Sequence, residues 1–191
     1  MKNSFRSEQS RNLIIQSALT IIARDGAARL TLDAIAKESG ISKGRLTHHF
    51  KNKEEIIKAL LEHQITYFGA QHQQHLKALG RDHAEANLIA QISTLYEIYS
   101  KPDPIAFAIL GALMENPMLL LPTLQRDSEV IQSIKAEAED PELAILRWMA
   151  ARGLAIFSLL GGNILSEKES QKLFERLKDN KQWQALKHNK I

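Results

Sequence analysis

The chain has 191 residues, of which 44% are hydrophobic and 25% are charged, with a net charge of +3 and no cysteine. These are ordinary values for a globular protein, so they argue against a globally disordered chain and exclude disulfides and thiolate chemistry. No apolar run approaches the roughly 20 residues that cross a membrane, and the N-terminus lacks the apolar core of a secretory signal. We expect a soluble, cytoplasmic protein.

The positive charge is concentrated near the N-terminus. Residues 1–55 contain ten Lys and Arg against six Asp and Glu, whereas residues 56–191 contain fifteen against sixteen. A local excess of cationic side chains favours binding to a polyanion such as nucleic acid. Basic chain ends also occur on proteins that bind no nucleic acid, so this pattern alone assigns no function.

The first predicted helix covers residues 7–25 and ends at Gly26. Residues 1–6 are expected to be disordered, with Lys2 and Arg6 acting as an arm over a DNA backbone. Helical spacing places one small apolar stripe on this helix, and it consists of Leu13, Ile14, Ser17, Ala18, Ile21 and Ile22.

The stretch from Thr31 to Lys53 predicts two short helices joined by a turn at Gly40. Thr31 and Ser42 have the side chains that cap helix N-termini, and glycine suits the left-handed turn between the helices. Apolar residues follow at helical spacing and face inward. This pattern indicates a helix-turn-helix, whose second helix enters the major groove of DNA.

The rest of the chain also carries residues that typically start and end helices. Asn52 and Glu55 have the spacing of a capping box, which predicts a long helix from residue 52 to about residue 80, roughly 40 Å in length. Five more helices are expected, at residues 82–101, 103–115, 117–139 with an interruption near Pro122, 141–160 and 166–177. Their start signals are Asp82 with Glu85, Asp103 with Pro104, Asp140 with Pro141, and Ser166 with Glu169. No strand pattern is present, so the predicted fold class is all-α with about nine helices.

The N-terminal motif resembles that of TetR-type transcriptional regulators over residues 8–60. The residues that carry the resemblance are Arg11, Ala18 and Gly26, then Thr31-Leu32-x-x-Ile35-Ala36, then Gly40-Ile41-Ser42-x-Gly44-x-Leu46, then His49-Phe50-x-x-Lys53-Glu54. The rest of the chain resembles the family only in its predicted helices, which are a long linking helix and about as many further helices as the family has.

The resemblance implies a two-domain organisation. Residues 1–52 would form the DNA-binding domain, and residues 53–191 would form a helical ligand-binding and dimerisation domain. It further implies a homodimer on a palindromic operator, with the helices at about 141–160 and 166–177 at the interface. A small-molecule effector would release the DNA, so a repressor is expected.

The chain departs from the family pattern within the second motif helix. Thr47 and His48 stand where the family usually carries aromatic residues, commonly a Tyr pair, and Ser39 stands where a small apolar residue is commoner. Thr and His can still donate to phosphate or contact a base. We therefore expect an altered set of contacts with DNA.

Ten residues are candidates for contact with DNA. Arg45 is placed to bind a guanine in bidentate fashion, near the exposed start of the second motif helix. The alternative is a structural helical hairpin with a solvated basic face. The candidates are Thr31, Ser42, Lys43, Gly44, Arg45, Thr47, His48, His49, Lys51 and Lys53.

A second group of residues can line an apolar ligand pocket with polar tips. At helical spacing each of them can equally be ordinary core. Arg147 and Arg152 lie in an otherwise apolar helix, where they can bind an acid or an interfacial carboxylate, or lie on its wet face. The pocket candidates are Tyr67, Phe68, Tyr96, Phe107, Met114, Trp148 and Arg152.

No other pattern indicates catalysis, a cofactor or a metal. His72 and His75 lie one helical turn apart, but no carboxylate or Cys stands at ligand spacing, so exposed polar helix residues are the favoured interpretation. No Ser/His/Asp order, carboxylate pair or nucleotide fingerprint is present, and an enzyme is not expected.

Two alternatives remain open. One is a DNA-binding protein of the same fold that responds to a protein partner instead of a small molecule. The other is a helical interaction or ligand-carrier module that binds no DNA and has a degenerate turn motif.

Overall fold

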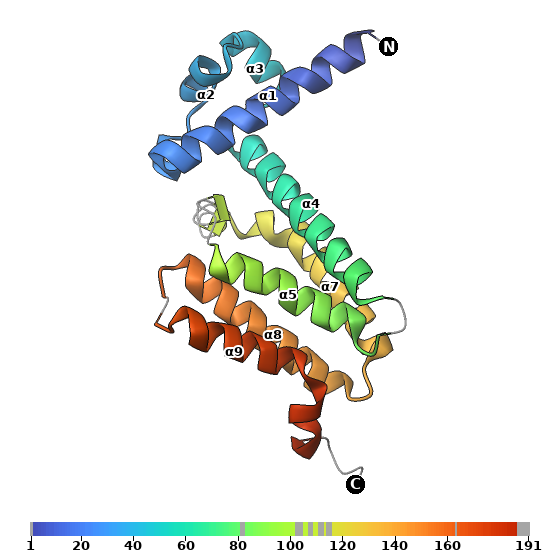
Figure 1. Ribbon diagram of the computed structural model, residues 1–191. Coiled ribbons are helices and arrows are strands. Elements are labelled where there is room, and N and C mark those ends of the chain that lie inside the picture. Colours follow the sequence, from blue (N-terminus) through green and yellow to red (C-terminus); the bar gives the residue numbers. More distant parts are fainter. Residues whose placement is uncertain are drawn as a thin grey trace. The chain divides into compact units, whose positions relative to one another are not determined.

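The computed structural model describes residues 2–80, 83–101, 105–106, 109–110, 113, 116–162 and 164–186. Every regular element within these residues is a helix, which confirms the predicted all-α class (Figure 1). The α-helices are α1 (Lys2–Asp25), α2 (Leu32–Ser39), α3 (Lys43–His49), α4 (Lys53–Leu79), α5 (Ala86–Ser100), α7 (Leu121–Glu137), α8 (Pro141–Leu159) and α9 (Glu167–Lys178). Short 3-10 segments lie at Ala27–Arg29, Pro117–Leu120 and Asn180–Leu186.

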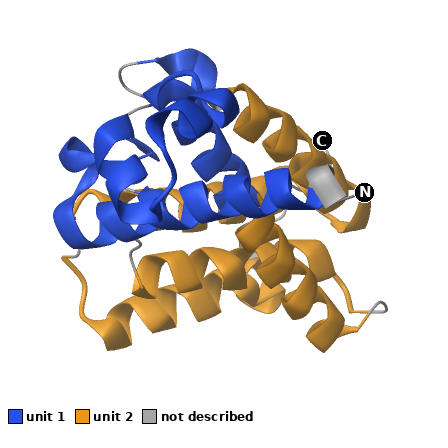
Figure 2. Cartoon of the chain, turned by 90° about the horizontal axis from the view of Figure 1, so that it is seen from above, with its two compact units in different colours: residues 1–65, 104–120 blue, residues 66–103, 121–191 orange. Residues whose placement is uncertain are grey.

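The chain divides into two compact units, coloured separately in Figure 2. The first unit comprises residues 1–65 and 104–120, and the second comprises residues 66–103 and 121–191. Helix α4 therefore contributes its first half to one unit and its second half to the other. The domain boundary predicted after residue 52 stays a prediction.

The core of the first unit is built from α1, α2, α3 and the start of α4. Within the apolar stripe predicted for α1, Leu13 is the exception, because its side chain is 48% exposed. Each buried aliphatic side chain contributes about 1.5–3 kcal/mol relative to an exposed one. The most deeply buried members are Ile14, Ala18, Ile21, Ile22, Ile35, Leu46, Ile56 and Leu60.

Helix α1 corrects one prediction. The sequence analysis expects disorder over residues 1–6, but the helix begins at Lys2 and continues to Asp25. Residues 2–10 contain neither Gly nor Pro, and Lys2, Arg6, Glu8 and Gln9 among them are good helix formers. A helix nucleated by the buried stripe therefore propagates toward the N-terminus.

The second unit is organised around α5, which packs against α7, α8 and α9. Its core contains Leu88 and Ile92 of α5, Ile134 of α7, Trp148 of α8 and Phe174 of α9. None of the described helices combines the length and apolar character needed to span a membrane.

Two predicted helix starts in this unit are confirmed. The Asp140 side chain accepts a hydrogen bond from the Leu143 amide at 3.0 Å, directly before Pro141 begins α8. At α9, Ser166 and Glu169 form a complete capping box. Both signals are local in sequence, which is why they could be identified without the fold.

Two other predicted helices differ from the structure in detail. Helix α5 begins at Ala86 and not at Asp82, which lies outside the described residues, because Glu85 adopts a left-handed conformation (φ 57°) and forms no capping bond. The interruption predicted near Pro122 is the change from the 3-10 segment at Pro117–Leu120 to α7, and Pro122 lies in the first turn of α7, where a missing N–H costs nothing. The helix predicted at residues 103–115 falls mostly outside the described residues.

Candidate nucleic-acid interface

The turn between α2 and α3 has the predicted geometry. The Thr31 hydroxyl accepts from the Ala34 amide at 3.1 Å, and the Ser42 hydroxyl accepts from the Arg45 amide at 3.4 Å. Gly40 ends α2 in the left-handed region, with φ 67°. Leu46 is fully buried and anchors α3 against α1 and α2. Thr31 and Ser42 are therefore capping residues whose hydroxyl protons stay available to donate.

The N-terminal part of α3 presents its polar side chains to solvent. Lys43, Gly44 and Arg45 at this end are exposed, as is His48 in the last turn, whereas Thr47 is half-buried. The Thr47 hydroxyl donates to the Gly44 carbonyl at 3.0 Å, so its oxygen can still accept a bond but its proton is engaged. Donor groups at this end of a helix are placed as direct readout of bases requires.

The two principal cations of α3 have partners within the first unit. The Lys43 ammonium lies 2.7 Å from the Asp33 carboxylate, with both side chains mostly exposed. The Arg45 Nη2 donates to the Ser10 hydroxyl at 2.5 Å. A guanidinium has five N–H donors, so this bond orients Arg45 and leaves others for a ligand. Sequence reasoning missed both Asp33 and Ser10, because only the packing of α1 and α2 on α3 brings them near.

The C-terminal end of α3 packs against Arg11 of α1. The Arg11 guanidinium lies over the Phe50 ring, 5.4 Å from its centroid. His49 is half-buried beside these groups, and burial, followed by the charges of His48, Arg45 and Arg11, lowers the pKa of its imidazole. At neutral pH His49 is therefore uncharged and can offer phosphate a single N–H but no positive charge.

Two further candidate cations flank the start of α4. Lys51 and Lys53 are exposed, and the Lys51 amide donates to the Glu55 carboxylate at 2.8 Å. The Asn52 side chain accepts from the Glu55 amide at 2.9 Å, which confirms the predicted start of α4. The Glu55 carboxylate thus bonds the amide of residue 51, whereas in a standard capping box it would bond the amide of residue 52. The lysine side chains remain available for phosphate.

The described residues among those predicted to line a ligand pocket have different surroundings. Tyr67 is 50% exposed, and its ring contacts that of Phe68. Tyr96 packs on Phe174 at 5.0 Å between ring centroids, and Trp148 is buried core. Phe107 and Met114 lie outside the described residues.

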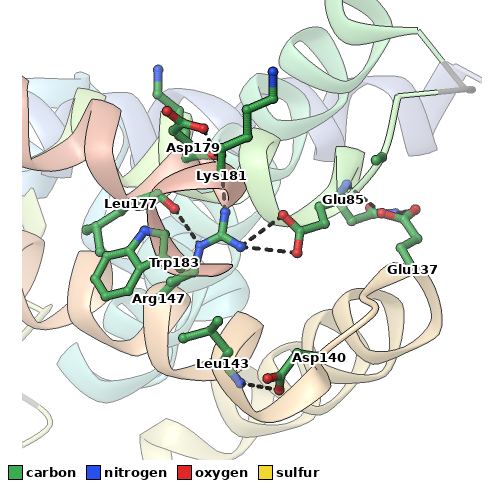
Figure 3. Close-up of polar contacts among 12 residues, drawn as sticks. Glu85, Glu137, Asp140, Leu143, Arg147, Leu177, Asp179, Lys181 and Trp183 are labelled. Carbon is green, nitrogen blue, oxygen red and sulfur yellow. Dashed lines mark hydrogen bonds and ion pairs between the residues drawn. The ribbon is translucent and has the colours of Figure 1, made fainter. Parts of the chain in front are cut away.

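Arg152 and Arg147 both form ion pairs inside the second unit. The Arg152 guanidinium lies 2.5 Å from the Asp127 carboxylate and over the Trp148 ring. Arg147 is only 1% exposed, so the wet-face interpretation is wrong for it. Figure 3 shows its guanidinium against the Glu85 carboxylate, with oxygen–nitrogen distances of 2.9 and 3.1 Å.

Arg147 also joins α8 to the end of α9. Its Nε donates to the Leu177 carbonyl at 2.8 Å, and its Nη2 donates to the Lys178 carbonyl at 3.1 Å. These carbonyls belong to the last turn of α9, where no intrahelical donor is available. Arg147 therefore neutralises a buried acid and satisfies a helix terminus with one side chain.

The histidines of α4 have separate environments. His72 is 5% exposed, which corrects the expectation of an exposed polar residue, whereas His75 is half-buried and pairs with Glu97 at 2.9 Å. Within the residues that the structure describes, no three His, Cys, Asp or Glu side chains are grouped as a metal site requires.

Comparison with known protein families gives two matches to the chain. Residues 14–60 match the model of bacterial regulatory proteins of the tetR family, and residues 88–181 match the tetracyclin repressor-like C-terminal domain. The first match covers the buried part of α1, the turn motif and the start of α4. The second begins at Leu88, in the first turn of α5, and covers what is described after it up to residue 181.

Curated relatives align with the N-terminal part only. The HTH-type transcriptional regulator SrpR of Pseudomonas putida is 35% identical over 60 residues, which are 31% of this chain and 28% of that protein. BetI of Yersinia pestis (strain Pestoides F) is 29% identical over 80 residues, which are 42% of this chain and 40% of BetI. The chain thus covers less than half the length of these relatives.

Solved structures share the whole fold at low identity. A transcriptional regulator from Streptomyces coelicolor A3(2), SCO7518, superposes with a TM-score of 0.69 at 18% identity, over 89% of this chain and 98% of that one. The multidrug binding protein EbrR complexed with imidazole gives 0.65 at 22% identity, over 88% and 89%. The two family matches, over residues 14–60 and 88–181, show that the chain belongs to the TetR family of bacterial transcriptional regulators.

Proposed function

We propose that the protein binds operator DNA as a homodimer and regulates transcription, with α3 of each protomer in a major groove. The observation that carries this proposal is the tetR-family match over residues 14–60, which falls on a capped helix-turn-helix with an exposed, polar N-terminal end of α3. A two-fold dimer reads a palindromic site, because identical helices meet identical half-sites one helical turn apart.

The proposed contacts divide into base-reading and phosphate-binding groups. Arg45, Lys43 and Gly44 form the base-reading end of α3, with His48 and Thr47 beside them. Cations and hydroxyl donors at helix starts bind phosphates, which fixes the register of the protein on the duplex. The phosphate-binding group consists of Thr31, Ser42, His49, Lys51 and Lys53.

Replacement of Arg45 tests this assignment. A bidentate bond to guanine contributes about 1–3 kcal/mol, and the dimer makes one in each half-site, so Arg45→Ala should weaken operator binding by about 2–6 kcal/mol, roughly 30-fold or more. The measurement is an electrophoretic mobility shift on the DNA that flanks the gene, with circular dichroism to verify folding. Lys77→Ala, which removes one exposed positive charge from the second unit, is the control and should bind like the wild type. Equal affinities for wild type and Arg45→Ala would remove Arg45 from the base-reading group.

The second copy in the proposed homodimer would bind the exposed apolar faces of α8 and α9. Leu146, Met149, Ile156 and Phe157 lie on one side of α8 at helical spacing and are 41–61% exposed, opposite the buried side that faces α5. Leu173 of α9 is also exposed. A large apolar face open to water favours burial against a partner of the same shape. This supports dimerisation through the helices predicted at about 141–160 and 166–177.

We further propose that a small-molecule effector controls DNA binding and releases a repressor from its operator. The support is the match to a tetracyclin repressor-like C-terminal domain over residues 88–181. Among the structural neighbours, EbrR is complexed with imidazole and a regulator from Saccharomonospora viridis is in complex with choline. An effector shifts such an equilibrium only if it binds the DNA-free conformation more tightly than the DNA-bound one.

A further inference from the structure

The guanidinium of Arg45 is bonded to a hydroxyl group of α1. Arg45 lies near the exposed start of α3, and its Nη2 donates to the Ser10 hydroxyl at 2.5 Å. The two residues are 35 positions apart in the sequence, so the bond forms only because α1 and α3 pack together. Ser10 also precedes the tetR-family match, which begins at residue 14. The contact is therefore a feature of this chain that the match does not include.

Ser10 is itself restrained by its place in α1. Its side chain is 6% exposed, although residues 5–9 before it and Arg11 after it are exposed. Its hydroxyl donates to the Arg6 carbonyl at 2.8 Å, one turn earlier in the helix. Because its proton is used in this bond, the oxygen remains as an acceptor for Arg45. A buried hydroxyl that both donates and accepts has a restrained rotamer and can orient the group bonded to it.

The bond to Ser10 leaves Arg45 able to read a base. Nη2 of a guanidinium carries two protons, one beside the Nε proton and the other beside an Nη1 proton, so they belong to two different edges of the planar group. The bond to Ser10 uses one of these protons and leaves the other edge complete. A bidentate contact with O6 and N7 of guanine requires one complete edge. Ser10 therefore restrains the plane of the guanidinium without using both of its edges.

The neutrality of Ser10 distinguishes Arg45 from its neighbour Lys43. The Lys43 ammonium lies 2.7 Å from the Asp33 carboxylate, so DNA must compete with a negative charge for it. Ser10 offers Arg45 a hydrogen bond but no counter-charge. The bond to Ser10 can therefore persist while the free edge of Arg45 binds a base.

We propose that Ser10 is a specificity-determining residue of the DNA-binding surface, which positions the Arg45 guanidinium for bidentate contact with one base. This inference rests on the proposed function. Immobilising a flexible side chain on binding costs about 2- to 12-fold in affinity, and a dimer contains two copies of Arg45. An arginine already ordered in the free protein avoids much of this cost. A restrained guanidinium also fits fewer acceptors than one that can turn to a phosphate or another base.

Removal of the Ser10 hydroxyl from the full chain tests the proposal. Ser10→Ala should weaken binding to the DNA flanking the gene roughly fivefold or more. Its affinity for unrelated DNA of equal length should stay unchanged, because non-specific binding depends on charge, which this substitution does not alter. Fluorescence anisotropy measures both affinities, and circular dichroism verifies folding.

Ser17→Ala is the matched control. Ser17 also lies on α1 with a side chain 6% exposed, but about two turns further along the helix. Its replacement removes a buried hydroxyl of the same kind and should leave both affinities unchanged.

A double-mutant cycle separates positioning from a structural role. If Ser10 acts through Arg45, loss of its hydroxyl has no effect on DNA binding once the guanidinium is gone. Arg45→Ala and the double variant Ser10→Ala/Arg45→Ala should therefore bind the flanking DNA equally well. The same loss with and without Arg45 would show that Ser10 acts only on the structure of α1.

The Arg45 side chain can also be observed directly in the DNA-free protein. NMR of the guanidinium ¹⁵N groups reports rotation about the Cζ–Nη bonds, which a hydrogen bond slows. Wild type should give separate Nη signals for Arg45, and Ser10→Ala should give averaged ones. If Ser10→Ala fails to fold, the wild-type spectrum still tests the proposal, since averaged signals there would mean that Ser10 does not hold Arg45.

Failure of this inference is distinguishable from failure of the proposed function. Wild type that does not prefer the flanking DNA over unrelated DNA contradicts the proposed function. Wild type that has this preference, with folded Ser10→Ala retaining it in full, contradicts only the role of Ser10.

Discussion

Arg147 and Glu85 are both almost fully removed from solvent, with side chains 1% and 6% exposed. Their pair joins the start of α5 to α8, and the remaining donors of Arg147 bond the end of α9 (Figure 3). Glu85 is also the single non-glycine residue with positive φ among the described residues. A left-handed conformation costs about 1–2 kcal/mol for an ordinary residue, so the ion pair and its bonds must offset that cost.

Removing one partner of the Arg147–Glu85 ion pair should strongly destabilise the folded protein. Arg147→Met leaves the Glu85 carboxylate buried without a partner, which typically costs about 3–5 kcal/mol. Urea denaturation should therefore show a large fall in the free energy of unfolding. Arg152→Met is the matched control, because its partner Asp127 is partly exposed and can regain water, so the loss should be well below that of Arg147→Met. Equal losses in both variants would refute the distinction.

His72 should make stability depend on pH near neutrality. Burial keeps its folded-state pKa below the ordinary 6.5, so the unfolded chain binds more protons between that lowered value and 6.5. The stabilising contribution is complete above about pH 6.5 and is lost as pH falls through the window below it. His49 acts with the same sign, whereas Glu169 and Asp25 have lowered pKa values and act only below pH 4.5 and 3.8.

The measurement is the free energy of unfolding at pH values of about 7.5 and about 5.5, on either side of the ordinary histidine pKa. Wild type should be less stable at the lower pH, and His72→Gln should reduce this difference because Gln does not titrate. A variant with the same pH dependence as wild type would show that His72 is not kept neutral by burial.

Two glycines of the candidate interface, Gly40 and Gly44, have different backbone conformations. Gly40 has φ 67°, and a Cβ added there would have no atom within 4 Å, so Gly40→Ala adds backbone strain of about 1–2 kcal/mol without any clash. Gly44 is inside α3 and equally open, so Gly44→Ala should stabilise the helix by about 0.5–1 kcal/mol. Thermal melts should move in opposite directions.

Operator affinity should also distinguish Gly44→Ala from Gly40→Ala, but in the opposite order to their stabilities. Folded Gly44→Ala is expected to lose operator affinity despite its higher stability, because a methyl group would stand where α3 approaches the bases. Folded Gly40→Ala should bind nearly as well as wild type below its melting temperature. Unchanged operator affinity in Gly44→Ala would place Gly44 away from DNA.

Elements with local start signals were predictable from sequence. The caps at Thr31, Ser42, Asp140 and Ser166 each depend on residues three positions apart, and all four are found where expected. The start of α5 was not predictable, because Glu85 is held by Arg147, 62 residues later in the chain. Local patterns carry no information about such a partner.

The candidate sites also contain both features that could be predicted from the sequence and features that could not. Exposure of Lys43 and Arg45 followed from the spacing of the apolar residues around Leu46. Their contacts with Asp33 and Ser10 did not, because they depend on how three helices pack. The burial of His72 was missed for a similar reason, since burial of a polar helix residue is decided by its neighbours, here on α5 and α7.

At the scale of the whole molecule, binding to a palindromic operator requires two copies of the chain. The exposed apolar face of α8 should be buried in the homodimer, so Met149→Glu should yield monomers by placing a charge there. Sedimentation velocity at micromolar concentration measures the mass. Leu124→Glu changes an equally exposed apolar residue of α7 and should leave the dimer intact. A dimeric Met149→Glu, or a monomeric wild type, would contradict the proposed interface.

The central claim, sequence-specific binding to DNA, is tested most directly by the affinity of the wild-type protein for the DNA flanking its own gene across a salt series. Fluorescence anisotropy between about 50 and 200 mM salt gives the slope of log affinity against log salt concentration. With Lys51 and Lys53 as the phosphate-binding cations of each protomer, a dimer neutralises about four phosphates, so we predict a slope of roughly −3 to −4 and a clear preference over unrelated DNA of equal length. No binding, or binding that does not change with salt, would contradict the claim.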